Sequence, residues 1–303
     1  MQKKKVLLLA NETSGVNSAV NEMFEIVKQL SLRNCLVTVY PIVPKEGLVS
    51  EDILLSEAEN YDVIACVGGD GTLNHLINTI MHMGLHKTIG YFPTGSTNDF
   101  FKSLNQGKNL SLKQKCRAVS DGKVFAYDVG KINEEYFNYV AAFGAFTKVS
   151  YDTPQDLKNA IGYGAYVLNV IGNIPEGLSY RQHVKYTCNG VTDEGDFIFG
   201  AVSNTRSVAG VQSKLISNSA LDDGEFEVIL ISAPNNLLDV NVILNKMLSG
   251  NTDDTHIIKL TTSSITFEFD EEVIWTLDGE ESKPSKTAEI TCCNKAVNML
   301  IHR

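Results

Sequence analysis

The chain has 303 residues and a mass of 33.2 kDa, enough for about two domains of ordinary size. Hydrophobic residues make up 43% and charged residues 20% of the chain, which is typical of a globular protein and excludes a disordered or fibrous one. Acidic residues outnumber basic residues by 36 to 26, and the pI is about 5.1. This balance argues against general nucleic-acid binding, which needs a basic surface.

Cysteine spacing and the length of the apolar runs indicate the redox environment of the protein and whether it carries a signal or membrane-spanning segment. The six cysteines show neither zinc-binding spacing nor a disulfide framework, so we expect a reducing, cytoplasmic environment. The apolar run Val6–Ala10 follows three lysines, as in a secretory signal, but it is shorter than the ~7–15 residues of a signal core. It is therefore predicted to be a buried strand. The longest nearly unbroken apolar run, Tyr139–Phe146, falls far short of the ~18 residues that span a bilayer.

Strands and helices alternate in the first third of the chain. Apolar runs predict strands over residues 6–10, 36–40, 63–67 and 89–92. Apolar residues at helical spacing predict helices over 20–30, 52–60 and 73–80, the last of which ends near Gly84. Strands separated by helices predict a parallel sheet covered on both faces. We therefore expect an α/β domain over residues 1–130.

The pattern changes after about residue 125. Strand-like runs follow at 124–132, 136–143, 183–189, 196–203, 225–231, 257–260, 264–269, 272–276 and 287–292. The pairs Asn189-Gly190, Asp223-Gly224 and Asp278-Gly279 are typical of turns, and one helix is predicted near 154–173. We expect a mainly antiparallel, β-sandwich-like domain over residues 131–303. The sequence leaves open whether residues 295–303 return to the first domain.

The strongest functional motif follows a buried strand and opens a helix. It consists of Gly68, Gly69, Asp70, Gly71, Thr72, Leu73 and Asn74. Ligands of an open α/β sheet bind at this end of the strands, where glycines let the backbone approach a phosphate and a helix N-terminus favours an anion. Because a carboxylate at Asp70 would repel a bare phosphate, the motif favours a magnesium-bound nucleotide. The structural alternative is a glycine-rich turn in which Asp70 caps the helix.

A second polar segment, Pro93–Phe100, follows the next predicted strand and is expected at the same edge of the sheet. Its hydroxyl and amide side chains, including Ser96 and Asn98, could bond phosphate oxygens. A helix start capped by Asn98 or Asp99 explains the segment equally well when it is taken alone. Two polar loops at adjacent strand ends together favour a nucleotide site.

The two loops together resemble those of the diacylglycerol kinase catalytic-domain family, and especially the bacterial soluble lipid kinases, to which sphingosine and ceramide kinases are related. The resemblance extends over nearly the whole chain. Asn11-Glu12-Thr13-Ser14-Gly15 is similar to the family's first nucleotide loop, Asn-Pro-x-Ser-Gly. Ala220–Gly224 resembles its A-x-x-D-G segment, and Asp278-Gly279-Glu280 resembles its D-G-E segment.

The resemblance implies an enzyme that uses ATP and Mg²⁺ to phosphorylate a lipid hydroxyl, with ATP between the two domains. The residues that would bind ATP are 68–74 together with Asn11, Thr13, Ser14, Gly15, Ser96 and Asn98. Asp70, Asp99 and Asp128 would surround the catalytic magnesium. A second, structural magnesium would bind Asp223 and the backbone carbonyls of Ala220 and Glu225. Glu280 corresponds to the residue that accepts the proton of the lipid hydroxyl.

The resemblance also implies a lipid substrate reached by transient, peripheral contact with a membrane surface. The acidic composition argues against a nucleic-acid partner, and a homodimer remains open. The chain departs from the family pattern at three places. Residues 40–44 carry no threonine after the second strand, no basic residue follows Gly15 directly, and Asn218 stands where relatives have proline. These departures leave the precise substrate undetermined.

Two other functions remain open at the level of sequence. NAD kinases share the Gly-Gly-Asp-Gly-Thr loop, but the Asp222-Asp223-Gly224 and Asp278-Gly279-Glu280 segments favour a lipid kinase. A non-catalytic module that binds nucleotide or lipid is the second alternative. The presence of both Asp70 and Glu280 argues against it.

Overall fold

The structure is a computed structural model that describes residues 3–11, 18–43, 45–94, 98–105, 108–144, 181–204, 207–208, 211–212, 220–249 and 256–302. Contacts within the chain divide it into two compact units. The first comprises Met1–Tyr127 with Lys295–Arg303, and the second comprises Asp128–Asn294. Within the described ranges, no helix is both long and apolar enough to cross a membrane.

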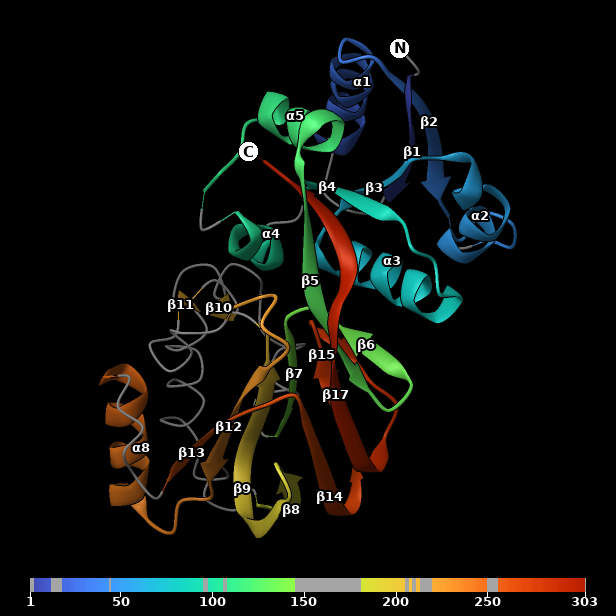
Figure 1. The fold of residues 1–303 in the computed structure, drawn as a ribbon. Helices are drawn as coiled ribbons and strands as arrows, with labels where there is room; N and C mark the ends of the chain where they lie inside the picture. The colour runs from blue at the N-terminus through green and yellow to red at the C-terminus, as the bar shows by residue number, and fades with distance from the viewer. Residues whose placement is uncertain are drawn as a thin grey trace. The chain divides into compact units, whose positions relative to one another are not determined.

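The first unit contains a parallel sheet in the order β2–β1–β3–β4 (Figure 1). Its strands are β1 (Lys4–Asn11), β2 (Cys35–Ile42), β3 (Val63–Gly68) and β4 (Thr88–Pro93). The end of the long strand β17 (Ser285–Ile301) pairs in parallel with β4, through Asn298 with Thr88 and Met299 with Ile89. The four strands predicted from apolar runs are confirmed.

Helices cover both faces of this sheet. They are α1 (Ser18–Ser31), α2 (Ser50–Glu57), the 3₁₀ turn η1 (Ala58–Asn60), α3 (Asp70–Met83), α4 (Asp99–Leu104) and α5 (Leu112–Asp121). Helix α1 packs against α5 and α2 against α3, and Figure 1 shows the two pairs on opposite sides of the sheet. Val6 and Leu8 of β1 pack in one core with Ile26 of α1, and the alternate residues Leu7 and Leu9 are also fully buried. Burial on both faces explains why these strands are continuous apolar runs.

The second unit consists mainly of antiparallel strands in the order β16–β15–β7–β9–β8–β14–β17, with β12 joining β9 to β13 and β5 joining β17 to β6. The strands are β5 (Lys123–Ile132), β6 (Glu135–Phe137), β7 (Val140–Gly144), β8 (Gln182–Cys188), β9 (Val191–Ser203), β12 (Phe226–Ser232), β13 (Ile257–Thr262), β14 (Ser264–Val273), β15 (Thr276–Leu277) and β16 (Glu280–Glu281). Strands β10 (Ser207–Val208) and β11 (Val211–Gln212) form a separate pair. With the first unit, this gives a mixed α/β fold with parallel and antiparallel strands.

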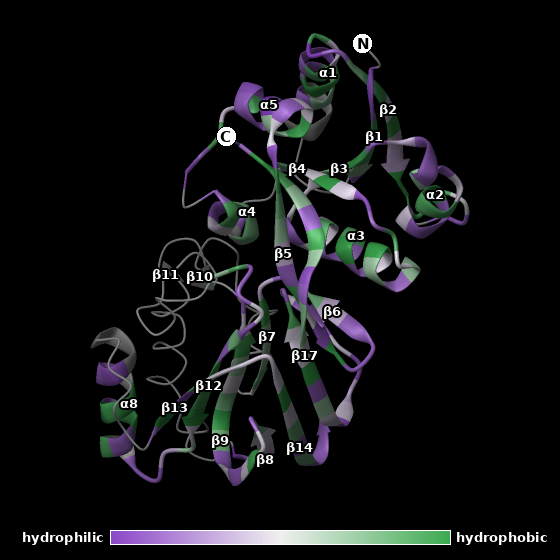
Figure 2. Ribbon diagram, in the orientation of Figure 1, coloured by the Kyte–Doolittle hydropathy of each residue, from purple (hydrophilic) through white to green (hydrophobic). Residues whose placement is uncertain are grey.

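The cores of the second unit lie on the two faces of its strands. In β14, Ile265, Phe267 and Phe269 are buried between more exposed neighbours, and Figure 2 shows the resulting alternation of hydropathy. Phe267 and Phe269 contact Trp275 with ring centroids 5.3 and 6.2 Å apart. On the opposite face of the strands, helix α8 (Leu237–Ser249) contributes Ile243 to a second cluster.

Three local predictions for the second unit differ from the structure. The predicted strand 136–143 is interrupted at Asn138 and Tyr139, which separate β6 from β7. The predicted strand 272–276 is divided between β14 and β15. The Asn189-Gly190 turn is confirmed as a hairpin with φ of 51° and 78°, whereas Asp223-Gly224 forms a bend before β12. The predicted helix 154–173 lies outside the described residues.

Candidate functional site

The Gly-Gly-Asp-Gly-Thr segment joins the carboxyl end of β3 to the N-terminus of α3. Gly68 is the last residue of β3, Gly69 is the N-cap of α3 and Asp70 is the first helical residue. Gly69, and not Asp70, is therefore the N-cap of α3, whereas the glycine-rich turn of the structural alternative is present. Asp70 carries its negative charge into the first helical turn, close to the backbone N–H groups that favour anions.

Neighbouring strand ends hold this loop. Asn11, at the end of β1, donates from Nδ2 to Thr72 Oγ1 over 3.1 Å. The Thr94 N–H, just after β4, donates to the Gly68 carbonyl over 2.9 Å. A Cβ on Gly68 would lie 2.5 Å from Thr72 Cβ, so only glycine allows this approach. The ends of β1, β3 and β4 therefore meet at one edge, as predicted for the two polar loops.

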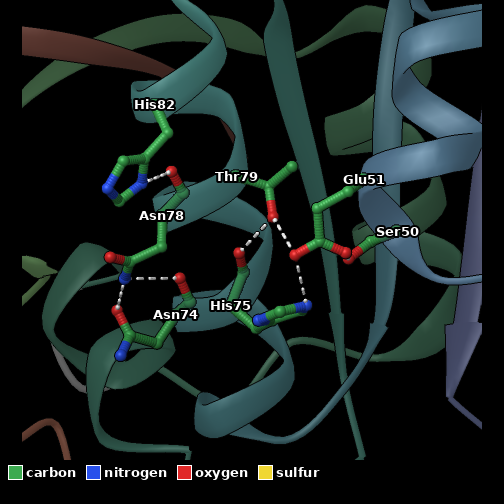
Figure 3. A network of polar contacts seen from close by, with 7 residues as sticks. All are labelled: Ser50, Glu51, Asn74, His75, Asn78, Thr79 and His82. Carbon is green, nitrogen blue, oxygen red and sulfur yellow. Dashed lines mark hydrogen bonds and ion pairs between the residues drawn. The ribbon is translucent and has the colours of Figure 1, made fainter. Parts of the chain in front are cut away.

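A polar network ties α3 to α2 behind the loop (Figure 3). His75 Nε2 lies 3.1 Å from Glu51 Oε1, and Thr79 Oγ1 donates to the same oxygen over 3.2 Å. Burial raises the pKa of Glu51, but a backbone hydrogen bond, the charge of His75 and hydrogen bonds from Ser50 and Thr79 together lower it overall. Asn78 Nδ2 donates to the carbonyl and to Oδ1 of the buried Asn74 (3.1 and 3.0 Å). His75 and Asn74 thus stabilise the helix that carries the loop.

The remaining predicted nucleotide residues are only partly described. Thr13, Ser14, Gly15 and Ser96 lie outside the described residues. Asn98 is the N-cap of α4 with φ of 49°, and its side chain does not cap the helix. Asp99 is the first residue of α4, and the structure does not describe its side chain.

Asp128, the third carboxylate expected at the catalytic magnesium, is fully buried in the second unit. Its Oδ2 accepts a hydrogen bond from Gly224 N over 2.6 Å, and its Oδ1 accepts one from Asn294 Nδ2 over 3.0 Å. Its backbone N–H donates to Leu221 O (2.7 Å), and its carbonyl accepts from Asn204 Nδ2 (2.7 Å). Asp128 therefore ties β5 to the 220–225 loop and to β17.

The residues expected at the second magnesium lie in one loop. The Asp223 carboxylate accepts hydrogen bonds from Ala220 N over 3.4 Å and from Glu225 N over 3.1 Å, and so links both ends of the 220–225 loop. Within the described part of the chain, no three His, Cys, Asp or Glu side chains form a ready metal cage. Magnesium is commonly held by one or two carboxylates, waters and substrate phosphates. The all-oxygen donors at Asp70 and Asp223 fit such an ion better than zinc.

Glu280 stands directly after a tight turn. Leu277 of β15 pairs with Glu280 of β16, and the two turn residues, Asp278 and Gly279, have φ of 52° and 101°. The Glu280 side chain is exposed, as a group that receives a proton from a substrate must be. Asp278 is 5% exposed and was not assigned a role from sequence. Burial raises the pKa of Asp278 to about 6, although N–H donors of Asn138, Val140 and Tyr139 oppose the rise.

The raised pKa of Asp278 predicts a pH-dependent contribution to stability. The folded protein binds this proton at a higher pH than the unfolded chain, whose pKa is 3.8. The contribution is therefore fully present below about pH 4 and decreases by up to about 3 kcal/mol as pH rises through 6. We expect the unfolding free energy of wild type, relative to that of Asp278→Asn, to fall as pH rises over this interval. Urea unfolding at pH 4, 5, 6 and 7 measures it, and a constant difference would contradict the assignment.

Sequence reasoning missed the hydrogen-bonding residues that surround these sites. Asn204 and Asn294 hold Asp128, and Asn138 holds Asp278. The Asp-Gly pair signalled a turn at 278–279, but nothing local indicated that its carboxylate is buried. The structural sign that sets this turn apart is the burial of the Asp278 carboxylate among N–H donors.

Comparisons with known proteins agree with the resemblance. Residues 5–132 match the diacylglycerol kinase catalytic domain. A diacylglycerol kinase of Bacillus subtilis (strain 168) is 30% identical over 220 residues, which cover 73% of this chain and 71% of that protein. One of Staphylococcus aureus (strain bovine RF122 / ET3-1) is 30% identical over 233 residues, covering 77% and 72%. A crystal structure of a diacylglycerol kinase from Bacillus anthracis shares the fold, with a TM-score of 0.79 and 22% identity over 100% of this chain and 98% of that one. The chain belongs to the diacylglycerol kinase catalytic-domain family.

Proposed function

We propose that the protein is a lipid kinase that transfers the γ-phosphoryl group of MgATP to the hydroxyl of diacylglycerol or a closely related lipid. The observation that carries the proposal is the Gly68–Asn74 loop at the β3–α3 junction, in a chain of the diacylglycerol kinase family. The relatives with about 30% identity are named for diacylglycerol, and their match covers most of both chains. The family match and these relatives do not favour NAD kinase, the alternative from sequence.

The first unit supplies nucleotide binding in this proposal. The N-terminal N–H groups of α3 would bond phosphate oxygens, and Gly68 allows the tight loop that presents them. Asp70 would hold the magnesium of MgATP, with Asn11 fixing Thr72 beside it. Bound magnesium supplies charge that offsets the negative charge developing on the phosphoryl oxygens.

The second unit supplies the acceptor side of the reaction. Glu280 is exposed at the edge strand β16. It would accept the proton of the lipid hydroxyl as that oxygen bonds the γ-phosphorus and the bond between this phosphorus and ADP breaks, releasing ADP. Asp223, with the carbonyls of Ala220 and Glu225, would hold a structural magnesium in the 220–225 loop. We assign a positioning role in this loop to Asp128, because its carboxylate already accepts the Gly224 N–H.

The lipid acceptor implies a reaction at a membrane surface. The chain carries a formal net charge of −10, so attraction to anionic lipid headgroups is a poor general means of docking. We therefore propose weak, reversible, peripheral association driven by the lipid substrate and a small apolar surface.

The proposed metal requirement has a direct test. Phosphoryl transfer from labelled ATP to diacylglycerol in mixed micelles should disappear when a chelator removes divalent ions, and it should return when Mg²⁺ is added in excess. The reason is that the carboxylates at Asp70 and Asp223 need a cation partner beside the phosphates. Full activity in chelator would contradict the magnesium assignment.

A further inference from the structure

The carboxylate of Asp278 is enclosed by four N–H donors from one short segment. Oδ2 accepts from the backbone N of Asn138 over 2.5 Å and from Asn138 Nδ2 over 3.2 Å. Oδ1 accepts from the backbone N of Tyr139 over 2.9 Å and from that of Val140 over 3.0 Å. Each carboxylate oxygen therefore has two donors, which is a strong arrangement for an ionised group.

Backbone bonds fasten the same residue to the same segment. The Asp278 N–H donates to the Val140 carbonyl over 2.9 Å, and the Tyr139 hydroxyl donates to the Asp278 carbonyl over 3.3 Å. The following strand is then set by pairing, because Leu277 pairs both with Ala141 of β7 and with Glu280 of β16. Asp278 thus fixes the β15–β16 hairpin against β7, and Glu280 is the second residue after it.

A tight turn does not by itself require this buried carboxylate. The β8–β9 hairpin turns through Asn189 and Gly190, whose φ of 51° and 78° resemble those of Asp278 and Gly279. Asn189 is exposed, and its side chain bonds only with Thr261 and Thr262 among the described residues. Burying a carboxylate is costly unless its hydrogen bonds compensate. Turn formation alone therefore does not account for the buried carboxylate of Asp278.

We propose that Asp278 is a positioning residue for the phosphoryl-transfer reaction, which holds Glu280 at the place where it accepts the proton of the lipid hydroxyl. This inference rests on the proposed function of Glu280. A displacement of about 1 Å at a reacting group can lower a rate by roughly 10²-fold. The β16 strand is only two residues long and ends the sheet, and the Asp278 bonds restrain the turn that leads into it, together with the pairing of β16 with β15.

A double-mutant cycle tests the inference. The variants are Asp278→Asn, which suits the left-handed turn and keeps one acceptor oxygen, Glu280→Gln, and the two together. Labelled-ATP transfer to diacylglycerol at pH 8 gives kcat and the KM for ATP. We expect Asp278→Asn alone to lower kcat roughly 10- to 100-fold with the KM for ATP within about twofold. In the Glu280→Gln background, it should lower kcat by less than about threefold, because the group that it positions is already lost.

Controls separate positioning from general damage to the fold. Asp270→Asn removes the same charge from an exposed site in β14 and should leave kcat unchanged. Thermal unfolding checks that each variant is folded. Should Asp278→Asn fail to fold, Asn138→Ala removes only the Nδ2 bond to Oδ2 and should lower kcat by a smaller factor that again vanishes in the Glu280→Gln background.

The outcomes distinguish the inference from the function on which it rests. An equal loss of kcat from Asp278→Asn with and without Glu280 would overturn the positioning role and leave the kinase intact. A raised KM for ATP with unchanged kcat would also overturn it. Wild-type turnover in Glu280→Gln alone would overturn both the assigned base and its positioning residue.

Discussion

Glu280→Gln is expected to lower kcat for lipid phosphorylation by roughly 10²–10⁴, the usual range for loss of a general base. Glutamine keeps the size of the side chain and the pairing of β16 with β15, but it cannot accept the hydroxyl proton. A loose transition state needs little deprotonation early in the reaction, which places the expected loss toward the lower end of this range. Steady-state rates with diacylglycerol in mixed micelles measure the effect.

Glu281→Gln provides a matched control for this variant, since Glu281 is exposed in the same two-residue strand and pairs with Thr276. It should retain wild-type turnover. Titration calorimetry with a non-hydrolysable ATP analogue should give nearly the same affinity for Glu280→Gln as for wild type. Lost nucleotide binding in Glu280→Gln would show that this residue belongs to the nucleotide site and not to proton transfer.

Asp70→Asn is expected to weaken MgATP binding and to lower kcat, with a combined loss of roughly 10²–10³ in kcat/KM. The reason is that it removes the negative charge that would attract the magnesium beside the phosphates. Asparagine is nearly isosteric, so the first turn of α3 should persist. The exposed Glu59, which pairs with Lys87, offers Glu59→Gln as a control in the same unit. If calorimetry and kinetics with Asp70→Asn matched wild type, the loop would have to bind its ligand without this carboxylate.

Much of the first unit could be predicted from sequence because its signals are local. The runs Val6–Ala10 and Val63–Val67 are apolar without interruption because both faces of their strands are covered. Gly84 ends α3 in the left-handed conformation, with φ of 63°, that glycine adopts at no steric cost. Helix α5 was missed, although Ser111 and Gln114 form a capping box at its start, because its apolar face is narrow.

The rest depends on contacts between residues far apart in the chain. The predicted strand 136–143 breaks at Asn138 because the N–H groups there bind Asp278, 140 residues later. Asp128 is likewise fully buried, and its carboxylate accepts hydrogen bonds from Gly224 and Asn294, which lie far along the chain. Sequence motifs therefore predicted the Gly68–Asn74 loop and Glu280 as site residues, whereas the residues that hold these groups in place emerged only from the fold.

Phosphoryl transfer to a panel of acceptors tests the central claim most directly. Labelled ATP and Mg²⁺ would be offered with diacylglycerol, phosphatidylglycerol, a sphingoid base and an undecaprenol-like alcohol in mixed micelles, and with NAD in solution. The account predicts labelled phosphatidic acid from diacylglycerol, or one dominant phosphorylated lipid, and no labelled NADP. Labelled NADP without any phosphorylated lipid, or ATP binding with no transfer to any acceptor, would contradict it.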